Sequence, residues 1–270
     1  MPSPDGIERA IRRLETRGRL EEADKAAIRS LPFLFRTLDP AAYIVREGEP
    51  PQSCALLLSG FAFRHKVTGS GERQIVSVHM AGEFLDLQNS FLGVADHNVQ
   101  ALTRCDIASV PVPALRALTE AHPRVGRAMW IDTLIDAAIF REWVVNVGRR
   151  DSISRIAHLL CEFALRLEAA GLAHDHRYHI PMTQEQIADC TGLTPVHVNR
   201  VLKELGRLGL IEREKRSVAI LQWDKLREIG DFSTRYLHLE FGGPSAVEAA
   251  PPPDAPPPIS AGEAFGKSPT

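Results

Sequence analysis

Residues 181–205 read PMTQEQIADCTGLTPVHVNRVLKEL, and this stretch decides the fold that we expect for the C-terminal half of the chain. Thr183, with Gln186 three positions later, fits a capping box, in which each side chain bonds the backbone N–H of the other residue. Gly192 then provides the backbone freedom that a tight turn between two helices needs. The pattern predicts a helix-turn-helix at about residues 183–203.

The second helix of this motif begins with signals of its own. Thr194 can cap it, and Pro195 takes the first helical position, where a missing N–H costs nothing. Apolar residues then recur at three- and four-residue spacing and form a predicted buried stripe: Val198, Val201, Leu202 and Leu205. Other positions of the helix face outward: Pro195, Val196, Asn199, Arg200 and Lys203.

The outward face of this second helix carries side chains that suit the recognition of bases and phosphates. In a helix-turn-helix, the N-terminal part of the second helix enters the major groove. Arg200 can bond guanine O6 and N7 as a fork, and Asn199 can reach adenine or a phosphate. Thr194 and His197 lie near the helix start, where hydroxyl, imidazole and backbone N–H groups can meet phosphate.

Residues 206–221 continue as a predicted two-stranded wing with its tip at Glu214–Ser217. Between Pro195 and Arg216, six basic residues stand against three acidic ones, although the whole chain has a net charge of −2. Positive charge therefore gathers where the motif predicts phosphate contact. The predicted DNA-binding residues are Thr183, Thr194, Pro195, Val196, His197, Asn199, Arg200, Lys203, Lys215 and Arg216. A plain helical hairpin is the alternative.

Upstream of the motif, the pattern from Ala114 to Val147 is helical, and Gly148 stands where a glycine commonly ends a helix. A helix of more than about 20 residues is long for a globular domain, and a continuous apolar stripe along it indicates a dimer seam. The stripe consists of Ile131, Leu134, Ile135, Ala138, Ile139 and Val145. The alternative is a core helix that packs within its own chain.

Asp151 or Ser152 can cap a further helix, which runs to about Ala170 and is stopped by Gly171. A short segment with three histidines follows, and we interpret it as a solvated loop, with a metal site as the alternative. These histidines are His174, His176 and His179.

The N-terminal half has a different pattern between Tyr43 and Pro113. Short apolar runs separated by turn residues predict an antiparallel sandwich or barrel. Residues 68–72 are the expected tip of a hairpin, and a last strand is expected within 101–113.

The two ends of the chain have sequence patterns that differ from those of the two halves. Residues 1–30 predict one or two short helices, and an amphipathic helix is expected from Trp223 to about Phe241. From Gly242 onward the chain is rich in Pro, Ala and Gly, which predicts a disordered tail. We see no signal peptide and no run of 18 apolar residues, so we expect a cytoplasmic protein without a membrane partner.

The four cysteines are far apart and lack metal-ligand spacing, so we expect mostly buried free thiols and no bound cofactor. Cys190, one residue before the turn of the motif, is the candidate for redox sensing. Its alternative role is that of a small core residue. The other three cysteines are Cys54, Cys105 and Cys161.

Taken with the motif, the sequence resembles the Crp/Fnr family of bacterial transcription regulators over roughly residues 28–223. The strongest part is Met182–Leu205. Weaker matches to the cyclic-nucleotide-binding β-roll of the family are Gly48-Glu49, the segment from Leu56 to Gly60, and Gly82-Glu83-Phe84. The resemblance implies an α+β homodimer that binds double-stranded DNA at a palindromic operator and contacts RNA polymerase.

The same resemblance implies a division of the chain. It predicts an N-terminal helical segment at 1–30, a β-roll sensor domain at 31–120 and a dimerisation helix at 121–148. A Crp-type winged helix-turn-helix follows at 149–223, then a C-terminal helix at 224–241 and the tail at 242–270.

The sequence departs from the family pattern in the β-roll sensor domain and in the second helix of the helix-turn-helix. Members that bind cyclic AMP pair its phosphate with an arginine, but this chain reads Asp86-Leu87-Gln88 and then His97-Asn98-Val99 in that region. Without the guanidinium, and with Asp86 nearby, we predict that cyclic AMP does not bind in the usual way. Val196 stands where many members place a glutamate that accepts a bond from cytosine. The effector pocket is expected at Gly82, Glu83, Asp86, His97 and Asn98.

Other sensor types and other function classes are less compatible with the sequence. Residues 1–53 contain no cysteine for an iron–sulfur cluster, and a haem sensor would need a ligand such as His65, His79 or His97. The absence of a phosphate loop, GxSxG or HExxH motif argues against an enzyme. The remaining alternative is a ligand-binding module whose helix-turn-helix docks a protein partner.

Overall fold

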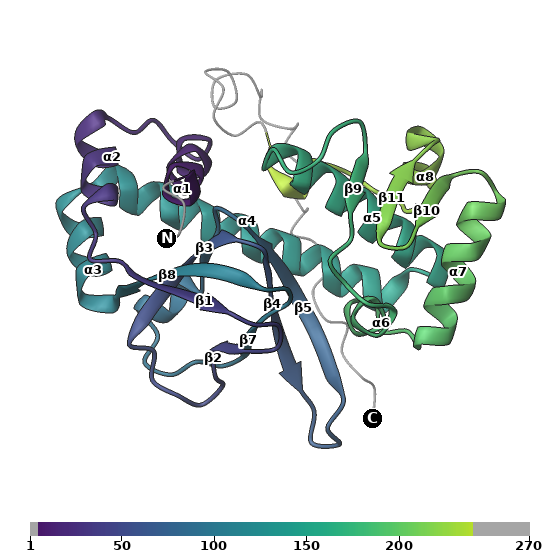
Figure 1. Cartoon of the computed structure of the whole chain (residues 1–270), viewed down its shortest axis with the longest axis horizontal. Coiled ribbons are helices and arrows are strands. Elements are labelled where there is room, and N and C mark those ends of the chain that lie inside the picture. Colours follow the sequence, from purple (N-terminus) through teal and green to yellow (C-terminus); the bar gives the residue numbers. More distant parts are fainter. Residues whose placement is uncertain (1–4, 240–270) are drawn as a thin grey trace, which may run out of the picture.

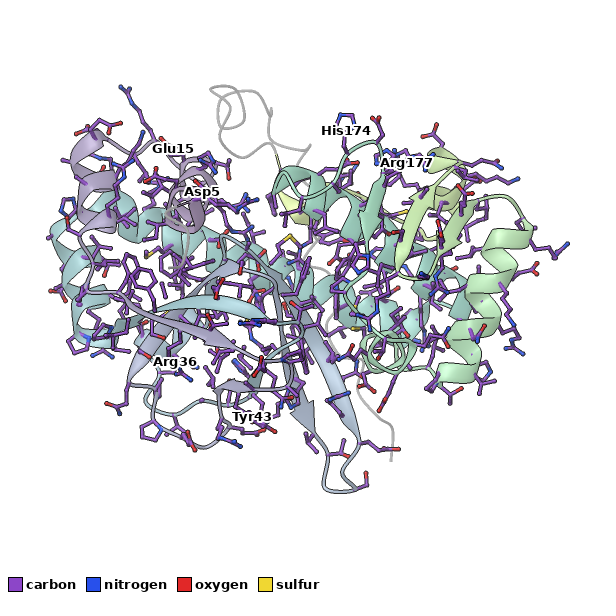
Figure 2. All side chains as sticks on the ribbon, in the orientation of Figure 1. Asp5, Glu15, Arg36, Tyr43, His174 and Arg177 are labelled. Atoms are coloured by element: carbon purple, nitrogen blue, oxygen red, sulfur yellow. The ribbon has the colours of Figure 1, made fainter. Side chains whose placement is uncertain are left out.

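The computed structural model describes residues 5–239, and the predicted tail from Gly242 lies outside these residues (Figure 1). It has two halves joined by one long helix. As predicted, the chain starts with two short helices, α1 (Asp5–Glu15) and α2 (Glu22–Arg29). Figure 2 shows side chains filling the space between the elements of both halves.

The N-terminal half is a β-roll of two four-stranded antiparallel sheets, as the run of short strands predicts. The sheet orders are β1-β8-β3-β6 and β2-β7-β4-β5. The hairpin tip expected at 68–72 is confirmed, because β4 pairs with β5 on either side of it. The bounds are β1 (Leu34–Leu38), β2 (Tyr43–Val45), β3 (Ser53–Ser59), β4 (Phe61–Val67), β5 (Arg73–Met80), β6 (Phe84–Leu85), η1 (Leu87–Ser90), β7 (Asn98–Ala101) and β8 (Cys105–Pro111).

The single strand that we expected from Ala101 to Pro113 is wrong at both ends, because β8 covers only Cys105–Pro111 and the next helix begins at Val112. Ala101 ends β7 in one sheet, and Cys105 begins β8 in the other. The residues between them carry the chain from one sheet to the other.

The long helix is confirmed, with different ends. The region from Ala114 to Val147 forms two helices, α3 (Val112–Ala121) and α4 (Pro123–Arg149), because Pro123 starts a new helix at its favoured first position. Our expectation that Gly148 ends the run is wrong. Gly148 is helical, and the helix stops only at Arg150, which has an extended backbone.

The C-terminal half begins with α5 (Ser152–Ala169), which Asp151 caps by accepting a bond from the Ser154 N–H. A three-stranded sheet and a helix pair then pack on α5, as Figure 1 shows. Their bounds are β9 (Arg177–His179), α6 (Gln184–Thr191), α7 (Pro195–Arg207), β10 (Ile211–Glu214), β11 (Ser217–Ile220), α8 (Trp223–Ile229) and η2 (Arg235–Leu237).

Two expectations for this half need correction. The segment with three histidines is not all loop, because β9 pairs with β11 and adds a third strand to the wing. The helix expected from Trp223 to Phe241 ends at Ile229. Gly230 packs so tightly on α5 that a Cβ atom there would lie 2.7 Å from the backbone nitrogen of His158. The chain turns at this contact and lays Phe232 and Tyr236 against the His158 ring.

The helices of residues 5–239 include none that is both long and apolar enough to cross a membrane.

Candidate DNA interface and effector site

The helix pair α6–α7 has the predicted local geometry at every signal that we used. The Thr183 hydroxyl accepts a bond from the Gln186 N–H, and the Gln186 side chain accepts one from the Thr183 N–H. Gly192 has a φ of 62°, a left-handed conformation that favours glycine. Thr194 caps α7 by accepting from the His197 N–H, and Pro195 is its first residue.

Arg155 of α5 holds this turn in place, and the sequence did not single it out. Its guanidinium donates to the carbonyl oxygens of Thr191, at 3.0 Å, and Gly192, at 3.3 Å. These carbonyls end α6, where no backbone N–H follows in helical register to satisfy them. Arg155 therefore ties the turn of the motif to α5.

The face of α7 that is opposite its buried stripe is exposed and carries free cations. The stripe of four apolar residues is buried as predicted, whereas the Val196 side chain is 79% exposed. In residues 5–239, no ion pair involves Arg200 or Lys203. Arg207, at the end of the same helix, is instead paired with Glu204 at 2.7 Å. The positive charge available to a ligand thus lies on the N-terminal two thirds of α7.

The wing adds two more exposed cations beside this face. β10 and β11 pair around a two-residue tip, in which Lys215 has a positive φ of 54°. The side chains of Lys215 and Arg216 are exposed and make no ion pair with any described residue. In Figure 1, α7 forms the outer edge of this half of the molecule, where a large ligand can approach it.

The β-roll contacts the helix-turn-helix directly. The sequence patterns did not predict this contact. Arg73, at the start of β5, pairs with Asp189 of α6 at 2.7 Å, and the Gln74 amide donates to the Asp189 carbonyl. These residues are more than 100 positions apart in the chain, so only the fold brings them together. The contact ties the hairpin of the sensor half to the first helix of the motif.

The expected effector residues lie in a buried network of charges. Asp86 is 2% exposed, and its carboxylate accepts two bonds from Arg64 and lies 2.8 Å from His97 Nε2. Arg64 also bonds Asp136 of α4 at 2.7 Å. Burial alone would raise the pKa of Asp86, but His97 and Arg64 lower it to about 2. The network therefore holds an ionised Asp86 between the roll and the long helix.

Glu83 belongs to a second part of the same network. Its carboxylate contacts His79, Arg13 and Arg166 at 3.0 to 3.3 Å. Burial would raise the pKa of Glu83, but the two arginines hold it well below its usual range. The cavity beside these groups has a volume of about 20 Å³, which is room for about one water molecule.

Of the other two residues expected in the effector pocket, Gly82 adopts a backbone conformation that favours glycine, and Asn98 bonds a backbone N–H. Gly82 has a φ of 97°, and a Cβ atom there would lie 2.9 Å from the Arg9 side chain. The Asn98 side chain accepts a bond from the Glu47 N–H. The structure thus brings Glu83, Asp86 and His97 together, but their polar atoms are occupied by other protein groups.

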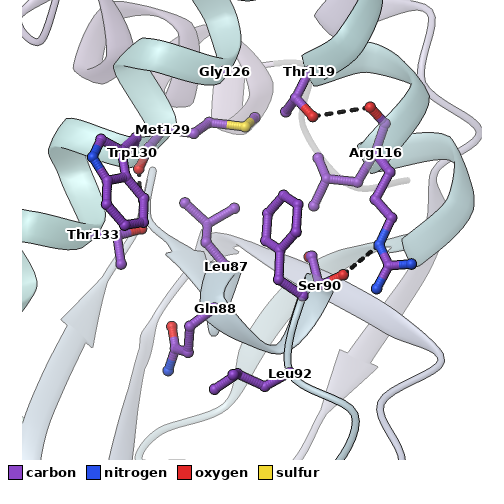
Figure 3. Close-up of a pocket in the computed structure, with 12 residues that line it drawn as sticks. Leu87, Gln88, Ser90, Leu92, Arg116, Thr119, Gly126, Met129, Trp130 and Thr133 are labelled. Atoms are coloured by element: carbon purple, nitrogen blue, oxygen red, sulfur yellow. Dashed lines mark hydrogen bonds between the residues drawn. The ribbon is translucent and has the colours of Figure 1, made fainter.

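A larger and mostly apolar pocket lies next to this network, between η1, α3 and the start of α4 (Figure 3). Its volume is about 390 Å³. The residues that line it include Met129 and Trp130 of α4 and Leu87 of η1, which Figure 3 labels, together with Phe91. Arg116 is held at the edge by a bond to the Ser90 carbonyl.

The four cysteines are all buried and free, as expected. Burial raises the pKa of the Cys190 thiol well above its ordinary value, and its sulfur lies 3.6 Å from that of Met182. Because the thiolate is the form that oxidants attack, this environment slows oxidation of Cys190. The surroundings match a small core residue.

No group of three or more potential metal ligands occurs among the described residues. Of the three histidines near β9, His176 contacts Glu168 and stacks on Trp223, while His174 is on the surface. Of the haem candidates, His79 and His97 contact carboxylates, and His65 is buried among ring side chains.

Sequence comparisons match both halves of the chain. A family model for a cyclic nucleotide-binding domain matches residues 35–122, and a model for a Crp-like helix-turn-helix domain matches residues 154–229. A probable transcriptional activator of Rhizobium leguminosarum is 25% identical over 79% of this chain and 86% of its own length. The transcriptional activator FnrL of Cereibacter sphaeroides is 25% identical over 83% of this chain and 91% of its own length.

Solved structures share the fold. The structure of FixK2 from Bradyrhizobium japonicum superposes with a TM-score of 0.68 at 22% identity and covers 74% of this chain and 98% of its own. A CRP-family regulator from Thermus thermophilus, TTHB099, gives a TM-score of 0.57 at 20% identity and covers 73% of this chain and 96% of its own. The two family models, the relatives and these folds agree on one architecture.

Proposed function

Because this chain belongs to the Crp/Fnr family of DNA-binding transcription regulators, we propose that two copies of it read a palindromic operator, each through α7 and the wing. The observation that carries this proposal is the set of exposed, unpaired cations on one face of the helix-turn-helix: Arg200, Lys203, Lys215 and Arg216. Unpaired positive charge concentrated on one face suits the phosphates of duplex DNA.

In this proposal, α7 enters the major groove with Arg200 at a guanine, while Thr183, Thr194, His197 and the wing contact phosphates. Val196 meets the base edges where many relatives of this family place a glutamate. An exposed valine offers apolar contact, which suits the methyl group of thymine. Asn199 is half-buried and lies beside Arg200 on the same helix.

Replacing Arg200 with alanine should weaken operator binding by about 1–3 kcal/mol and relax base preference at one position of each half-site. The operator is first obtained by selecting bound sequences from random duplex DNA, and affinities are then measured by gel shift. The matched control is Arg207→Ala, which removes an exposed arginine already paired with Glu204 on the same helix. If both variants kept the wild-type affinity and base preference, α7 would not be the reading helix.

The dimer is proposed to form along α4, because that helix leaves large apolar side chains uncovered in a single chain. The exposed ones include Trp130, Leu134, Phe140, Val144 and Val145. Leu134 and Val145 belong to the stripe expected from the sequence, whereas Ile135 and Ile139 of that stripe are buried within their own chain. The stripe is therefore divided, because Ile135 and Ile139 pack within their own chain while Leu134 and Val145 remain available to the proposed dimer.

We propose that the sensor end does not bind cyclic AMP, since Arg64 is committed to two carboxylates and the space beside Asp86 holds about one water. Cyclic AMP at millimolar concentration should leave the melting temperature unchanged, because a ligand that does not bind adds no stability. Differential scanning calorimetry at matched ionic strength measures this. A clear rise would show that the network opens for a nucleotide.

The remaining parts of the proposal follow the family. Contact with RNA polymerase is proposed as the route to transcription, and no catalytic role is proposed for the chain. Arg73 and Asp189 join the sensor half to α6, so a change in the roll has a direct path to the reading motif.

A further inference from the structure

A cleft of about 550 Å³ lies between α1, α4, the end of α5 and the segment around η2. Sites for small molecules commonly have volumes of about 300–1,000 Å³. Five arginines line it, and none of the described residues in its lining is acidic: Arg9, Arg12, Arg13, Arg17 and Arg166. Its apolar part includes Ile135, Ile139 and Leu237. The cleft is separate from the reading face, and it adjoins the network at Asp86 through Arg13 and Arg166, which both contact Glu83.

The carboxylates that accompany these arginines lie outside the lining. Asp132 accepts bonds from Arg13 at 3.1 Å and from Arg17 at 3.0 Å. Arg166 contacts Glu83 and Glu162. These pairs fix the positions of three guanidinium groups without placing negative charge on the surface of the cleft.

The other two arginines have spare donors. Arg9 donates to the Ala170 carbonyl, and no carboxylate in residues 5–239 pairs with it. Arg12 is exposed, and its side chain makes no hydrogen bond or ion pair with any described residue. Guanidinium groups bind phosphate and carboxylate groups through two parallel bonds, which suits them to organic anions.

The positive charge in the cleft is only partly compensated. Burial lowers the pKa of Arg17, and repulsion from Arg13 lowers it further, while Asp132 opposes both effects. An added anion would relieve this repulsion. The positive charge and the size of the cleft therefore both favour a small organic anion.

We propose that this cleft binds a small organic polyanion, whose phosphate or carboxylate groups contact Arg9 and Arg12 while its apolar part lies on Ile135 and Ile139. The walls come from α1 of the N-terminal half and from α5 and η2 of the C-terminal half. Such a ligand therefore contacts both halves and stabilises one arrangement of them. This makes the cleft an effector site that does not depend on the residues at Asp86.

The proposed dimer leaves this cleft open. Ile139 lies five residues after Leu134, which places it about 140° around the helix from the exposed stripe. A partner on that stripe would therefore not cover the arginines.

The test measures binding of ATP and of citrate to the full chain by isothermal titration calorimetry, at millimolar ligand and matched ionic strength. ATP represents phosphate ligands and citrate represents carboxylate ligands. At least one should bind, and Arg12→Gln should weaken that binding about tenfold, since a charge-assisted bond is lost. Two control variants should bind as wild type does: Arg200→Ala, which alters the DNA-reading face, and Arg36→Gln, which removes an exposed arginine of β1.

Three results would overturn the proposal. The first is that neither ATP nor citrate binds. The second is that Arg12→Gln binds the ligand as tightly as Arg36→Gln does. The third is that, among the variants, Arg200→Ala alone loses binding of the ligand. The last result would place the anion on the DNA-reading face. Because Arg200 and Arg12 lie on different elements, failure of the cleft leaves the DNA-binding proposal intact, and the gel-shift series tests that one separately.

Discussion

Replacing both Trp130 and Leu134 with glutamate should convert the protein to a monomer and weaken operator binding by about 100-fold or more, since joining two binding modules raises affinity by about 10²–10⁴. The two side chains are 63% and 48% exposed in the single chain and lie one helical turn apart. Large apolar side chains at such positions indicate a covered surface. Glutamates there would place opposing negative charges within the dimer seam, where desolvation makes them costly.

Light scattering measures the mass, and gel shift measures affinity for the full and half operator. The wild type should have about twice the chain mass of 29.8 kDa, and the double variant should have the chain mass. The control is Leu34→Glu with Val67→Glu, which changes two exposed apolar residues on the roll. A double variant in α4 that remained dimeric would show that the seam lies elsewhere.

The features that the sequence predicted correctly are set by near neighbours in the chain. The capping box of Thr183 and Gln186 and the left-handed Gly192 depend on contacts within a few residues. Such signals give the same local structure wherever the segment packs in the fold. The same is true of Pro195 at the start of α7.

The features that the sequence did not predict depend on distant contacts. Nothing near Phe241 shows that the last helix stops at Ile229, because the cause is the close approach of Gly230 to α5. The pairing of Arg73 with Asp189 is equally invisible in a linear pattern. The apolar spacing alone suggested a longer helix, whereas Gly230 and Asp231 are poor helix formers and the packing of Gly230 on α5 agrees with a stop there.

The expected effector site has one feature that depends on the local sequence and others that depend on distant contacts. The sequence drew attention to Asp86 as a negative charge in the expected effector pocket, and in the structure Asp86 is buried and bonded to Arg64 and His97. It could not identify Arg64 and Asp136 as its neighbours, which lie 22 and 50 positions away in the chain. In this chain, ion pairs within the protein occupy the polar atoms of the expected effector residues.

Replacing Arg64 with methionine should lower the free energy of unfolding by about 3–5 kcal/mol at neutral pH, because it leaves the buried Asp86 and the half-buried Asp136 without their shared cation. Methionine keeps much of the side-chain volume, so the loss reports charge more than packing. Asp86 and Asp136 lose a partner that links the roll to α4. Urea unfolding measures the loss, with Arg36→Met as an exposed control on β1.

The pH dependence of this loss separates charge from packing. In the wild type, burial raises the pKa of Asp86, but His97 and Arg64 together bring it down to about 2. The folded-state pKa is therefore below the unfolded one. The stability that Asp86 contributes is present above about pH 4 and is lost as the pH falls toward 2. Without Arg64 the carboxylate takes up a proton more readily, so the difference between variant and wild type should shrink as the pH falls from 7 to about 4.5.

Adding Asp136→Asn to Arg64→Met should restore part of the lost stability, because it removes one of the two stranded charges. The single variant Asp136→Asn leaves Arg64 bonded to Asp86 and should cost less than Arg64→Met. A loss of stability that is independent of pH and unchanged by Asp136→Asn would mean that Arg64 acts through its methylene stem. In that case the ion pairs at Asp86 would not be what holds the roll against α4, and the argument that they exclude a nucleotide would lose its energetic basis.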